Sequence, residues 1–336
     1  MRYYYRKSAL LSAPLYNRRQ VRAGYCFLVI GLLVLLCLDL SAQFTYQKLL
    51  VDYDNSWEYK NLKIIPIRPK GLPGTLSSVP AEVSQLVPFR EAIQKGYVTV
   101  QERGSSSIEN VHWLSVYNNS DKPVYISSGE ILEGGRQDRV VTKDTVLLPK
   151  TRRMDLPVMC VEEGRWSEKD KKFIHKGMAN TGLRKVLDVS RNQVLIWKEI
   201  DRQLQEDSIK SKTLSYLATR TDKKFIEAEN DYLNFFRKQL SQSDSNIVGV
   251  VCISGDKILG SDIFLTTDLF LNQSDPLLLG YIDQAISKGK KPEVSDDKIK
   301  KYMDQILTDE KTQKEFLQKN GKQFFFKDKL IHISSY

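Results

Sequence analysis

The chain has 336 residues, and hydrophobic residues make up 41% of it, which is enough to bury one large core or two smaller ones. Its formal net charge is +10, but residues 1–42 contain six basic residues and only one acidic residue, so half of that charge belongs to this segment. The rest of the chain is too weakly basic for its charge alone to indicate a nucleic-acid partner.

Residues 1–42 show the pattern of a secretory signal peptide. Basic residues precede an apolar run from Tyr25 to Leu38, and Ser41-Ala42-Gln43 supplies small residues at a cleavage position. The run is short for a membrane-spanning helix, which needs about 20 apolar residues, and a retained anchor is the alternative interpretation. We expect cleavage after Ala42, an exported chain that is periplasmic or secreted, and membrane contact only through this segment.

Residues 43–165 are predicted to be mainly β-structure. Turn residues separate short runs that are rich in Val, Ile, Leu, Tyr and Thr, as expected for a set of strands. The expected strands are Leu62–Ile67, Tyr97–Glu102, His112–Tyr117, Pro123–Ser127, Thr145–Leu148 and Pro157–Val161. A short helix is expected over Phe89–Gln94.

Residues 167–240 change to a helical period. Apolar side chains recur there at spacings of three and four residues, which places them on one face of a helix. The two apolar stripes consist of Ile196, Ile200 and Leu204 and of Phe225, Ala228, Tyr232 and Phe236. Asp222 is expected to cap the second helix. Such stripes are typical of helices that pack against a core.

The last third of the chain combines strands and helices. Ser254-Gly255-Asp256 indicates a hairpin turn, and Asp275-Pro276 is typical of a helix start. The expected elements are the strands Ile247–Ile253 and Lys257–Phe264, a helix from Asp275, a helix over Asp296–Leu317 and a strand over Phe324–Ile333. The sequence therefore predicts an α+β fold with a β-rich N-terminal half, a helical middle, and a β-hairpin plus helices near the C-terminus.

Only Cys160 and Cys252 remain outside the signal segment. Both lie in apolar runs, where buried unpaired cysteine is common. An oxidising compartment would also allow them to pair, and the sequence alone does not fix connectivity. Cys160 has no histidine near it in the sequence, so it is the least favoured candidate for a catalytic nucleophile.

The densest group of chemically active side chains lies in two segments, GEILEGGRQDR (Gly129–Arg139) and CVEEGRW (Cys160–Trp166). Several familiar sites are excluded. The three histidines lack metal-ligand spacing, and neither a CxxC pair nor a GxSxG elbow occurs. The first segment starts like a P-loop, but Gly135-Arg136 follows where that motif requires Lys-Ser/Thr. None of these familiar motifs therefore indicates a metal site, and the sequence leaves metal use open and names no cofactor.

The side chains of these two segments suit the binding of an anion. Arginines can grip a phosphate or carboxylate through two hydrogen bonds, and paired glycines allow a close turn. The carboxylates could act as acid and base or hold a divalent cation, and a tryptophan can stack on a ring. The expected site residues are Glu130 and Glu162 in catalytic roles and Gly134, Gly135, Arg136, Gln137, Asp138, Arg139, Arg165 and Trp166 in ligand binding. The alternative is that the same residues form structural ion pairs and a turn.

The two segments resemble the ARG and Rhodanese-Phosphatase-superfamily-associated protein domain family, in which ARG stands for ADP-ribosylglycohydrolase. The family pattern has Gly-Glu, then Gly-x-x-Gln-Asn-Arg, then Cys-Val-Glu-x-Gly-Arg-Trp. Asp138 stands where the family usually has Asn, which adds a negative charge. The resemblance covers roughly residues 60–290, and it implies a domain over residues 43–290 followed by a helix-and-strand extension over residues 291–336.

The family name records a genomic association with enzymes that process ADP-ribose. The resemblance therefore implies a small anionic or nucleotide-type ligand, such as ADP-ribose, that the protein binds or processes. The alternative is a non-catalytic envelope protein, a binding or assembly module whose polar motifs only brace the fold. A nucleic-acid partner is not expected under either hypothesis.

Overall fold

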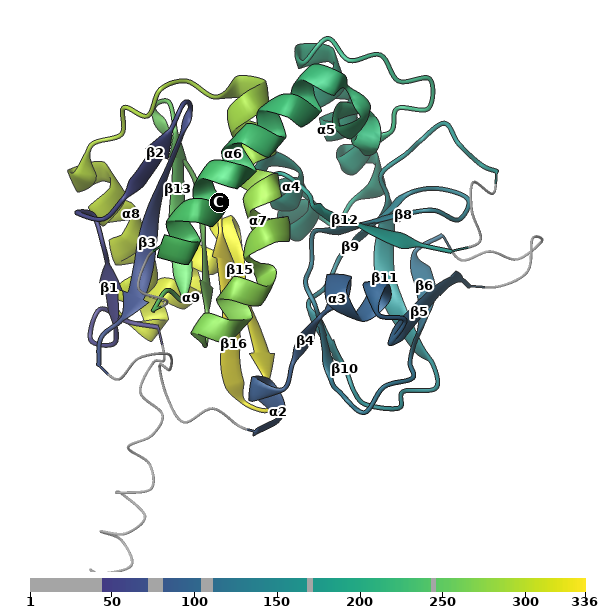
Figure 1. The fold of residues 1–336 in the computed structure, drawn as a ribbon, viewed down its shortest axis with the longest axis horizontal. Helices are drawn as coiled ribbons and strands as arrows, with labels where there is room; N and C mark the ends of the chain where they lie inside the picture. The colour runs from purple at the N-terminus through teal and green to yellow at the C-terminus, as the bar shows by residue number, and fades with distance from the viewer. Residues whose placement is uncertain (1–43, 72–80, 104–110, 168–171, 243–245) are drawn as a thin grey trace, which may run out of the picture. The chain divides into compact units, whose positions relative to one another are not determined.

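The structure is a computed structural model, and it describes residues 44–71, 81–103, 111–167, 172–242 and 246–336 (Figure 1). The expected signal segment and its cleavage position lie outside these residues. Residues 43–336 form one compact unit. Among the described residues, none of the helices combines the length and the apolar character that crossing a membrane requires.

The largest sheet joins strands from both ends of the described chain. Its strands are β1 (Leu49–Val51), β2 (Trp57–Tyr59), β3 (Leu62–Pro69), β13 (Gly249–Ser254), β14 (Lys257–Phe264), β15 (Gly321–Phe326) and β16 (Lys329–Ser335). Their order is β1-β3-β13-β14-β16-β15, with β2 also paired to β3, and every pairing is antiparallel. All six residues of β13 are buried, and only the last of them, Ser254, is polar, so apolar and polar residues do not alternate along this strand.

Besides the short α2 (Ala81–Ser84), four longer helices among the described residues share the core of this sheet. They are α6 (Lys223–Gln242), α7 (Thr267–Lys288), α8 (Asp296–Leu307) and α9 (Glu310–Asn320). Figure 1 shows α6 and α7 in front of the sheet. The predicted cap of α6 is confirmed, because the Asp222 carboxylate accepts a hydrogen bond of 3.0 Å from Phe225 N. Residues 291–336 supply α8, α9, β15 and β16, so they contribute two strands to the large sheet.

Two smaller sheets occupy the part of the chain between β3 and α4. One has the order β10 (Thr145–Leu147), β7 (Val124–Ile126), β4 (Val87–Pro88). The other has the order β12 (Ile174–Met178), β8 (Glu130–Glu133), β9 (Arg139–Val141), β11 (Met154–Cys160), β6 (Trp113–Asn118), β5 (Val98–Glu102). The described residues of this part of the chain also include the short helices α2 (Ala81–Ser84) and α3 (Phe89–Gln94).

The six-stranded sheet separates two cores. On β8, Leu132 faces a core that includes α3, whereas Ile131 faces a core formed with α4 (Thr181–Ser190), α5 (Gln193–Glu206) and η2 (Tyr216–Thr221). On β9, Val141 and Val140 divide in the same way. Successive side chains of a strand point to opposite faces, so each of these strands packs against both layers.

The α+β fold is confirmed: strands dominate residues 49–178, helices dominate residues 181–242, and hairpins and helices follow. The six strands expected before residue 165 each overlap an observed strand, and α3 has the predicted bounds. Cys160 and Cys252 are both buried and free, so no disulfide joins them.

Three predicted elements near the C-terminus are wrong. The helix expected from Asp275 begins at Thr267, with Thr266 as its cap, and Pro276 lies inside it. The helix expected over Asp296–Leu317 is two helices, because Thr308 ends α8 and the Asp309 side chain caps α9. The strand expected over 324–333 is a hairpin, because Lys327 and Asp328 both adopt positive φ values (49° and 60°), as a tight hairpin turn requires.

Candidate functional site

The two charged segments lie side by side because β9 pairs with β11, with Arg139 opposite Cys160. Just beyond this pair, Val161 N donates to Asp138 O at 3.0 Å. Arg165 then bridges the segments, with Nη2 2.9 Å from Asp138 Oδ1 and Nε 2.6 Å from Glu162 Oε2. Strand pairing therefore brings the expected arginine and carboxylates together.

These contacts belong to a larger group that we call the motif lattice: Gly134, Gln137, Asp138, Glu162, Arg165 and Thr213. Asp138 accepts a hydrogen bond from Gly134 N at 3.0 Å, and Gln137 Nε2 donates to Glu162 O at 2.7 Å. Thr213 Oγ1 donates to Glu162 Oε1 at 2.7 Å. Asp138, Glu162 and Gln137 are buried, and Arg165 exposes only 12% of its side chain. The lattice thus ties the two segments to the loop after α5.

The paired glycines of the turn are explained by packing within the protein. Gly134 has φ of 135°, and a Cβ atom there would lie 2.5 Å from Lys172 O. Gly135 has φ of 54°, and a Cβ atom there would lie 2.4 Å from Phe173 Cζ. Both positions are therefore closed to other residues by left-handed backbone and by close contact with residues 172–173.

Arg139 and Arg136 both contact Glu102 at the end of β5. The Arg139 side chain is 1% exposed, donates to Gln137 O at 2.7 Å and lies 3.6 Å from Glu102 Oε1. Arg136 N donates to the same carboxylate oxygen at 2.9 Å. Sequence analysis missed Glu102 because it lies more than 30 residues before the glycine turn, at the end of an ordinary strand. Thr213 belongs to the stretch Ser211-Lys212-Thr213, but the sequence alone does not indicate its contact with Glu162.

Glu130 lies at the start of β8 and contacts residues outside the motif lattice. Its side chain is fully buried, and Oε2 accepts from Ser127 N at 2.9 Å. Its other oxygen lies 3.3 Å from His175 Nε2 on β12. The two expected catalytic carboxylates, Glu130 and Glu162, therefore have separate sets of partners.

Arg136, which is partly exposed, lies beside the exposed Trp166. Trp166 is 53% exposed, and the Arg136 guanidinium lies 5.8 Å from the centroid of its ring. This distance is within the range of a cation–π contact. A guanidinium stacked on an open ring presents hydrogen-bond donors and a planar surface together.

Cys160 is not poised to react as a thiolate. It is 2% exposed, and burial raises the pKa of its thiol although Arg139 opposes this shift. The Gln193 side chain accepts from Cys160 N at 2.9 Å and donates to Cys160 O at 2.8 Å, so it extends the edge of β11. These contacts give Gln193 and Cys160 a structural role.

A second polar group lies deep under the large sheet, and we call it the buried charge core: Arg184, Asp262, Tyr281, His332 and Ser334. Arg184 is 1% exposed and donates twice to Asp262, at 3.1 and 2.7 Å. Asp262 also accepts from Tyr281 OH at 2.6 Å and lies 2.9 Å from His332 Nε2. Sequence analysis singled out none of these residues, because they lie on four elements far apart in the chain.

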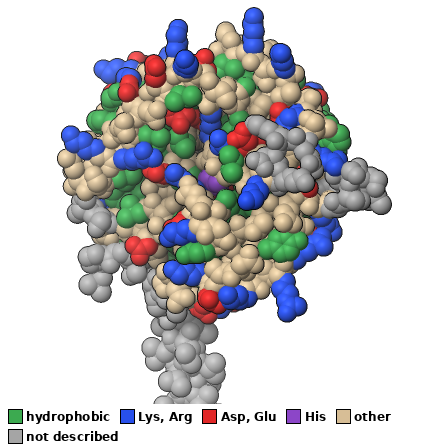
Figure 2. All heavy atoms as spheres, turned by 45° about the vertical axis from the view of Figure 1, so that its right-hand side comes forward, with side chains coloured by type: hydrophobic (Ala, Val, Ile, Leu, Met, Phe, Trp, Pro, Cys, Tyr) green, Lys and Arg blue, Asp and Glu red, His purple; other side chains and the backbone are tan. Residues whose placement is uncertain are grey.

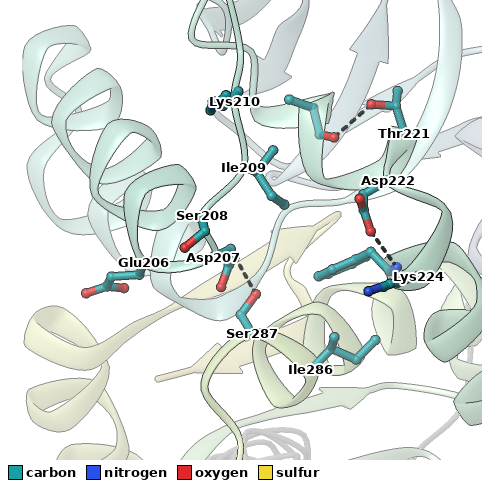
Figure 3. Close-up of a pocket in the computed structure, with 12 residues that line it drawn as sticks. Glu206, Asp207, Ser208, Ile209, Lys210, Thr221, Asp222, Lys224, Ile286 and Ser287 are labelled. Carbon is teal, nitrogen blue, oxygen red and sulfur yellow. Dashed lines mark hydrogen bonds between the residues drawn. The ribbon is translucent and has the colours of Figure 1, made fainter.

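A cavity of about 710 Å³ lies between the end of α5, the start of α6 and the end of α7. Figure 3 shows residues that line it. Asp207 and Ser287 point toward one another there, and Ser287 Oγ donates to Asp207 at 2.7 Å. Burial raises the pKa of Asp207. Asp222, which also lines the cavity, is the cap of α6. The residues that line this cavity include none of the expected site residues.

The described residues offer no group of three or more His, Cys, Asp and Glu side chains that could hold a metal ion. On the face shown in Figure 2, basic and acidic side chains are interspersed and do not gather into one broad area of a single charge.

A family model for the ARG and Rhodanese-Phosphatase-superfamily-associated Protein domain matches residues 50–336. Neither a curated protein nor a solved structure matches the chain. The match covers both charged segments and extends through α8, α9, β15 and β16.

Proposed function

We propose, from the premise that this chain belongs to the ARG and Rhodanese-Phosphatase-superfamily-associated Protein domain family, that it binds a small anionic ligand with a planar ring. The ligand class is the nucleotide type, and ADP-ribose is its first candidate. The binding surface in this proposal is the pair Arg136 and Trp166. The observation that carries it is the guanidinium stacked on an exposed indole at the end of the motif lattice.

The contacts around this pair support a rigid binding surface. Glu102 holds the backbone of Arg136, and Arg165 donates to Gly135 O at 2.7 Å. Arg165 directly precedes Trp166, so its bonds to Asp138 and Glu162 restrain the segment that carries the indole. A surface that is fixed before binding loses less conformational entropy on binding. The indole would stack on a base, and the guanidinium would bind a phosphate.

Binding without a reaction is the form of the proposal that the contacts favour. Glu162 accepts hydrogen bonds from Arg165 and Thr213, and Glu130 is buried against Ser127 and His175. A general acid or base has to come within hydrogen-bond reach of the substrate. We therefore assign both carboxylates to holding the surface in place and propose no chemical step.

Residues 43–336, which form one compact unit, are the material for the test. ADP-ribose, NAD, AMP and inorganic phosphate are titrated with and without magnesium, and melting temperature and calorimetric heat are followed. Saturable binding raises the melting temperature. We expect Trp166→Ala and Arg136→Ala each to weaken nucleotide binding about tenfold or more, since stacking on an aromatic side chain contributes about 1–3 kcal/mol per base.

Trp113→Ala is the matched control, because Trp113 is also a partly exposed tryptophan but lies on β6, outside the two segments. This control should leave nucleotide affinity unchanged. The proposal is wrong if no anion shifts the melting temperature, or if Trp113→Ala and Trp166→Ala weaken binding equally.

A second candidate function is that of a non-catalytic assembly module whose motif lattice only braces the fold. The burial and mutual hydrogen bonds of Asp138, Glu162 and Gln137 favour it. Arg165→Gln separates the two functions, because it removes the bridge between Asp138 and Glu162 within the lattice. If the lattice only braces the fold, the variant should be less stable than the wild-type chain, and the wild-type chain should bind none of the ligands. If the lattice supports a ligand site, the wild-type chain should bind a ligand measurably.

Export after cleavage near Ala42 is a further part of the proposal, and it rests on the residue pattern of residues 1–42. The full chain with a C-terminal tag is produced in its native cells, the cells are fractionated, and the N-terminus is determined by mass spectrometry. A chain that begins at Gln43 outside the cytoplasm is expected. An uncleaved chain in the cytoplasm would contradict export.

A further inference from the structure

A second concave site lies between the C-terminal end of α4, helix α9 and strand β15. This cavity has a volume of about 410 Å³, and none of the residues of the two charged segments lines it. Six charged side chains line it: Lys143, Asp144, Asp188, Arg191, Lys314 and Lys322. Its size is within the range of small-molecule sites.

The two carboxylates of the cavity are held from behind by the protein. Asp144 accepts from Tyr125 OH at 3.1 Å and from Ser127 Oγ at 3.2 Å. Asp188 accepts from Ser128 Oγ at 3.0 Å and from Tyr336 OH at 2.7 Å. Their side chains are therefore fixed as part of the wall, and neither carboxylate is left to bind a cation.

Positive charge is in excess in the cavity. Lys322 Nζ lies 2.6 Å from Asp144 Oδ2, so these two charges balance each other. Lys143, Arg191 and Lys314 are exposed, and their side chains form no ion pair with any residue that the structure describes. With Asp188 as the one remaining carboxylate, the lining carries a net positive charge, which attracts an anion.

Lys322 adds a donor at the inner wall of the cavity. Its Nζ atom is buried and pairs with Asp144 Oδ2 at 2.6 Å, and no other described residue accepts a hydrogen bond from it. An ammonium group has three donors, and leaving buried donors without an acceptor is unfavourable. An oxyanion in the cavity would supply acceptors when the Lys322 side chain turns toward it.

Aromatic side chains of β15 provide the apolar part of the lining. Phe325 is 52% exposed, and Phe324 stacks on Tyr125 with 5.6 Å between the ring centroids. Exposed Phe beside unpaired cations suits a ligand that is both apolar and anionic. We propose that this cavity binds a small organic anion, a carboxylate or phosphate monoester that carries one planar or apolar group.

In this arrangement the anionic group faces Arg191, Lys314 and Lys322, and the apolar group lies against Phe325. The site is independent of the Arg136–Trp166 surface, and it goes beyond the proposed function.

Phenyl phosphate, benzoate and inorganic phosphate are the probes, and calorimetric titration of the purified chain measures their affinities. We expect saturable binding, with phenyl phosphate or benzoate tighter than inorganic phosphate. The tighter of the two organic probes identifies the acidic group that the site prefers.

The double variant Arg191→Glu/Lys314→Glu reverses two exposed charges and leaves the buried pair of Asp144 and Lys322 intact. We expect it to weaken the affinity for the organic anion about tenfold or more, because two attractive charges become repulsive. Lys311→Glu, an exposed lysine on α9 outside the lining, is the matched control and should leave affinity unchanged. Phe325→Ser should weaken phenyl phosphate and benzoate but not inorganic phosphate.

Trp166→Ala separates this inference from the proposed function, and it should leave binding of these probes unchanged. The inference is overturned if the wild-type chain binds none of the three probes saturably. It is also overturned if the double variant binds as tightly as the Lys311→Glu control, or if Trp166→Ala abolishes binding while the double variant retains it. Failure of the nucleotide titrations would leave these results unaffected, because they depend on different residues.

Discussion

In both the motif lattice and the buried charge core, an arginine pairs with carboxylates. The two groups differ in how deeply the arginine is buried and in how far apart the paired residues lie in the sequence. Arg165 of the lattice keeps 12% of its side chain exposed and pairs with residues 3 and 27 positions away. Arg184 of the buried charge core is 1% exposed and pairs with Asp262, 78 positions away. Charge density in the sequence therefore marks where the chain folds back locally, whereas the more deeply buried charges come from distant parts of the chain.

The largest expected effect is that of Asp262→Ala. Removing this carboxylate leaves the Arg184 guanidinium buried without a counter-charge, and it also removes the acceptor of Tyr281 OH and Ser334 Oγ. We expect unfolding free energy to fall by about 3–5 kcal/mol, as measured by urea denaturation.

Asp155→Ala is the control for this change, because Asp155 pairs with Arg103 and Arg153 near the surface. It should cost less than about 1 kcal/mol. Equal losses in the two variants would show that depth does not distinguish the buried charge core from a surface pair.

The second effect is a loss of stability in acid. Burial raises the pKa of Asp262 and Asp144, but the facing Arg184, Lys322 and His332 more than offset this and hold both pKa values below the ordinary value of 3.8. A carboxyl with a lowered pKa in the folded state stabilises the protein above its unfolded pKa, and this contribution is lost as the pH falls. Unfolding free energy should therefore decrease below about pH 5.

Asp144→Asn tests which carboxyl is responsible. The variant should be less stable at pH 7 but should lose less on going from pH 6 to pH 3, as followed by urea titration at each pH. An unchanged slope would show that Asp144 does not contribute to the acid transition.

The third effect tests the motif lattice. Arg165→Gln removes the bridge between Asp138 and Glu162. It should cost about 2 kcal/mol, since hydrogen bonds between charged groups contribute about 1.5–3 kcal/mol. Trp166→Ala, one residue away and largely exposed, should cost within about 0.5 kcal/mol. If both variants lose equal stability in thermal and urea unfolding, the lattice does not brace the fold.

The smallest effect concerns Glu229 on α6. Burial raises the pKa of Glu229 to about 7, and the nearby Asp283 adds to the shift. The folded state then binds the proton more tightly than the unfolded state, so stability falls as the pH rises from about 4.5 to 7. Glu229→Gln removes this dependence, and because the side chain is partly exposed we expect a gain of only about 1 kcal/mol at pH 8.

The gain from Glu229→Gln should be smaller at pH 5, where the native carboxyl is already protonated. Glu227→Gln, an exposed position on the same helix, should show no such difference between pH 5 and pH 8. Urea unfolding at the two pH values measures both variants. A gain that is equal at the two pH values would mean that Glu229 titrates normally.

Local patterns were enough to predict most of the fold. Turn residues bound the strands β3, β5 and β7 and the short helix α3, so each of these elements can be recognised from its own residues. Pro276 misled the prediction, because proline is typical of a helix start. Within α7 it removes only one backbone donor, and the burial of both Leu277 and Tyr281 offsets this loss.

The candidate site could be predicted in part. The proximity of Asp138, Glu162 and Arg165 follows from two strand-adjacent motifs that pair. The contacts of Glu102 and Thr213 with the two segments could not be found, because tertiary packing sets strand order and loop position. The cavity beside β15 depends on the hairpin turn at Lys327-Asp328. This turn contains neither glycine nor asparagine, so no turn signal in the sequence indicated where the cavity lies.

The order of the large sheet has a consequence for when the chain can fold. Strand β3 lies between β1 and β13, and Ile67 is paired with Gly249, about 180 residues further along. Pairings between such distant segments form slowly, because a long loop must close before any contact stabilises it. Until the ribosome has synthesised β13, β3 lacks the strand that pairs with this edge in the folded protein. If the chain is exported as proposed, a secretory translocon, which threads unfolded polypeptide, would receive it before its central sheet has closed.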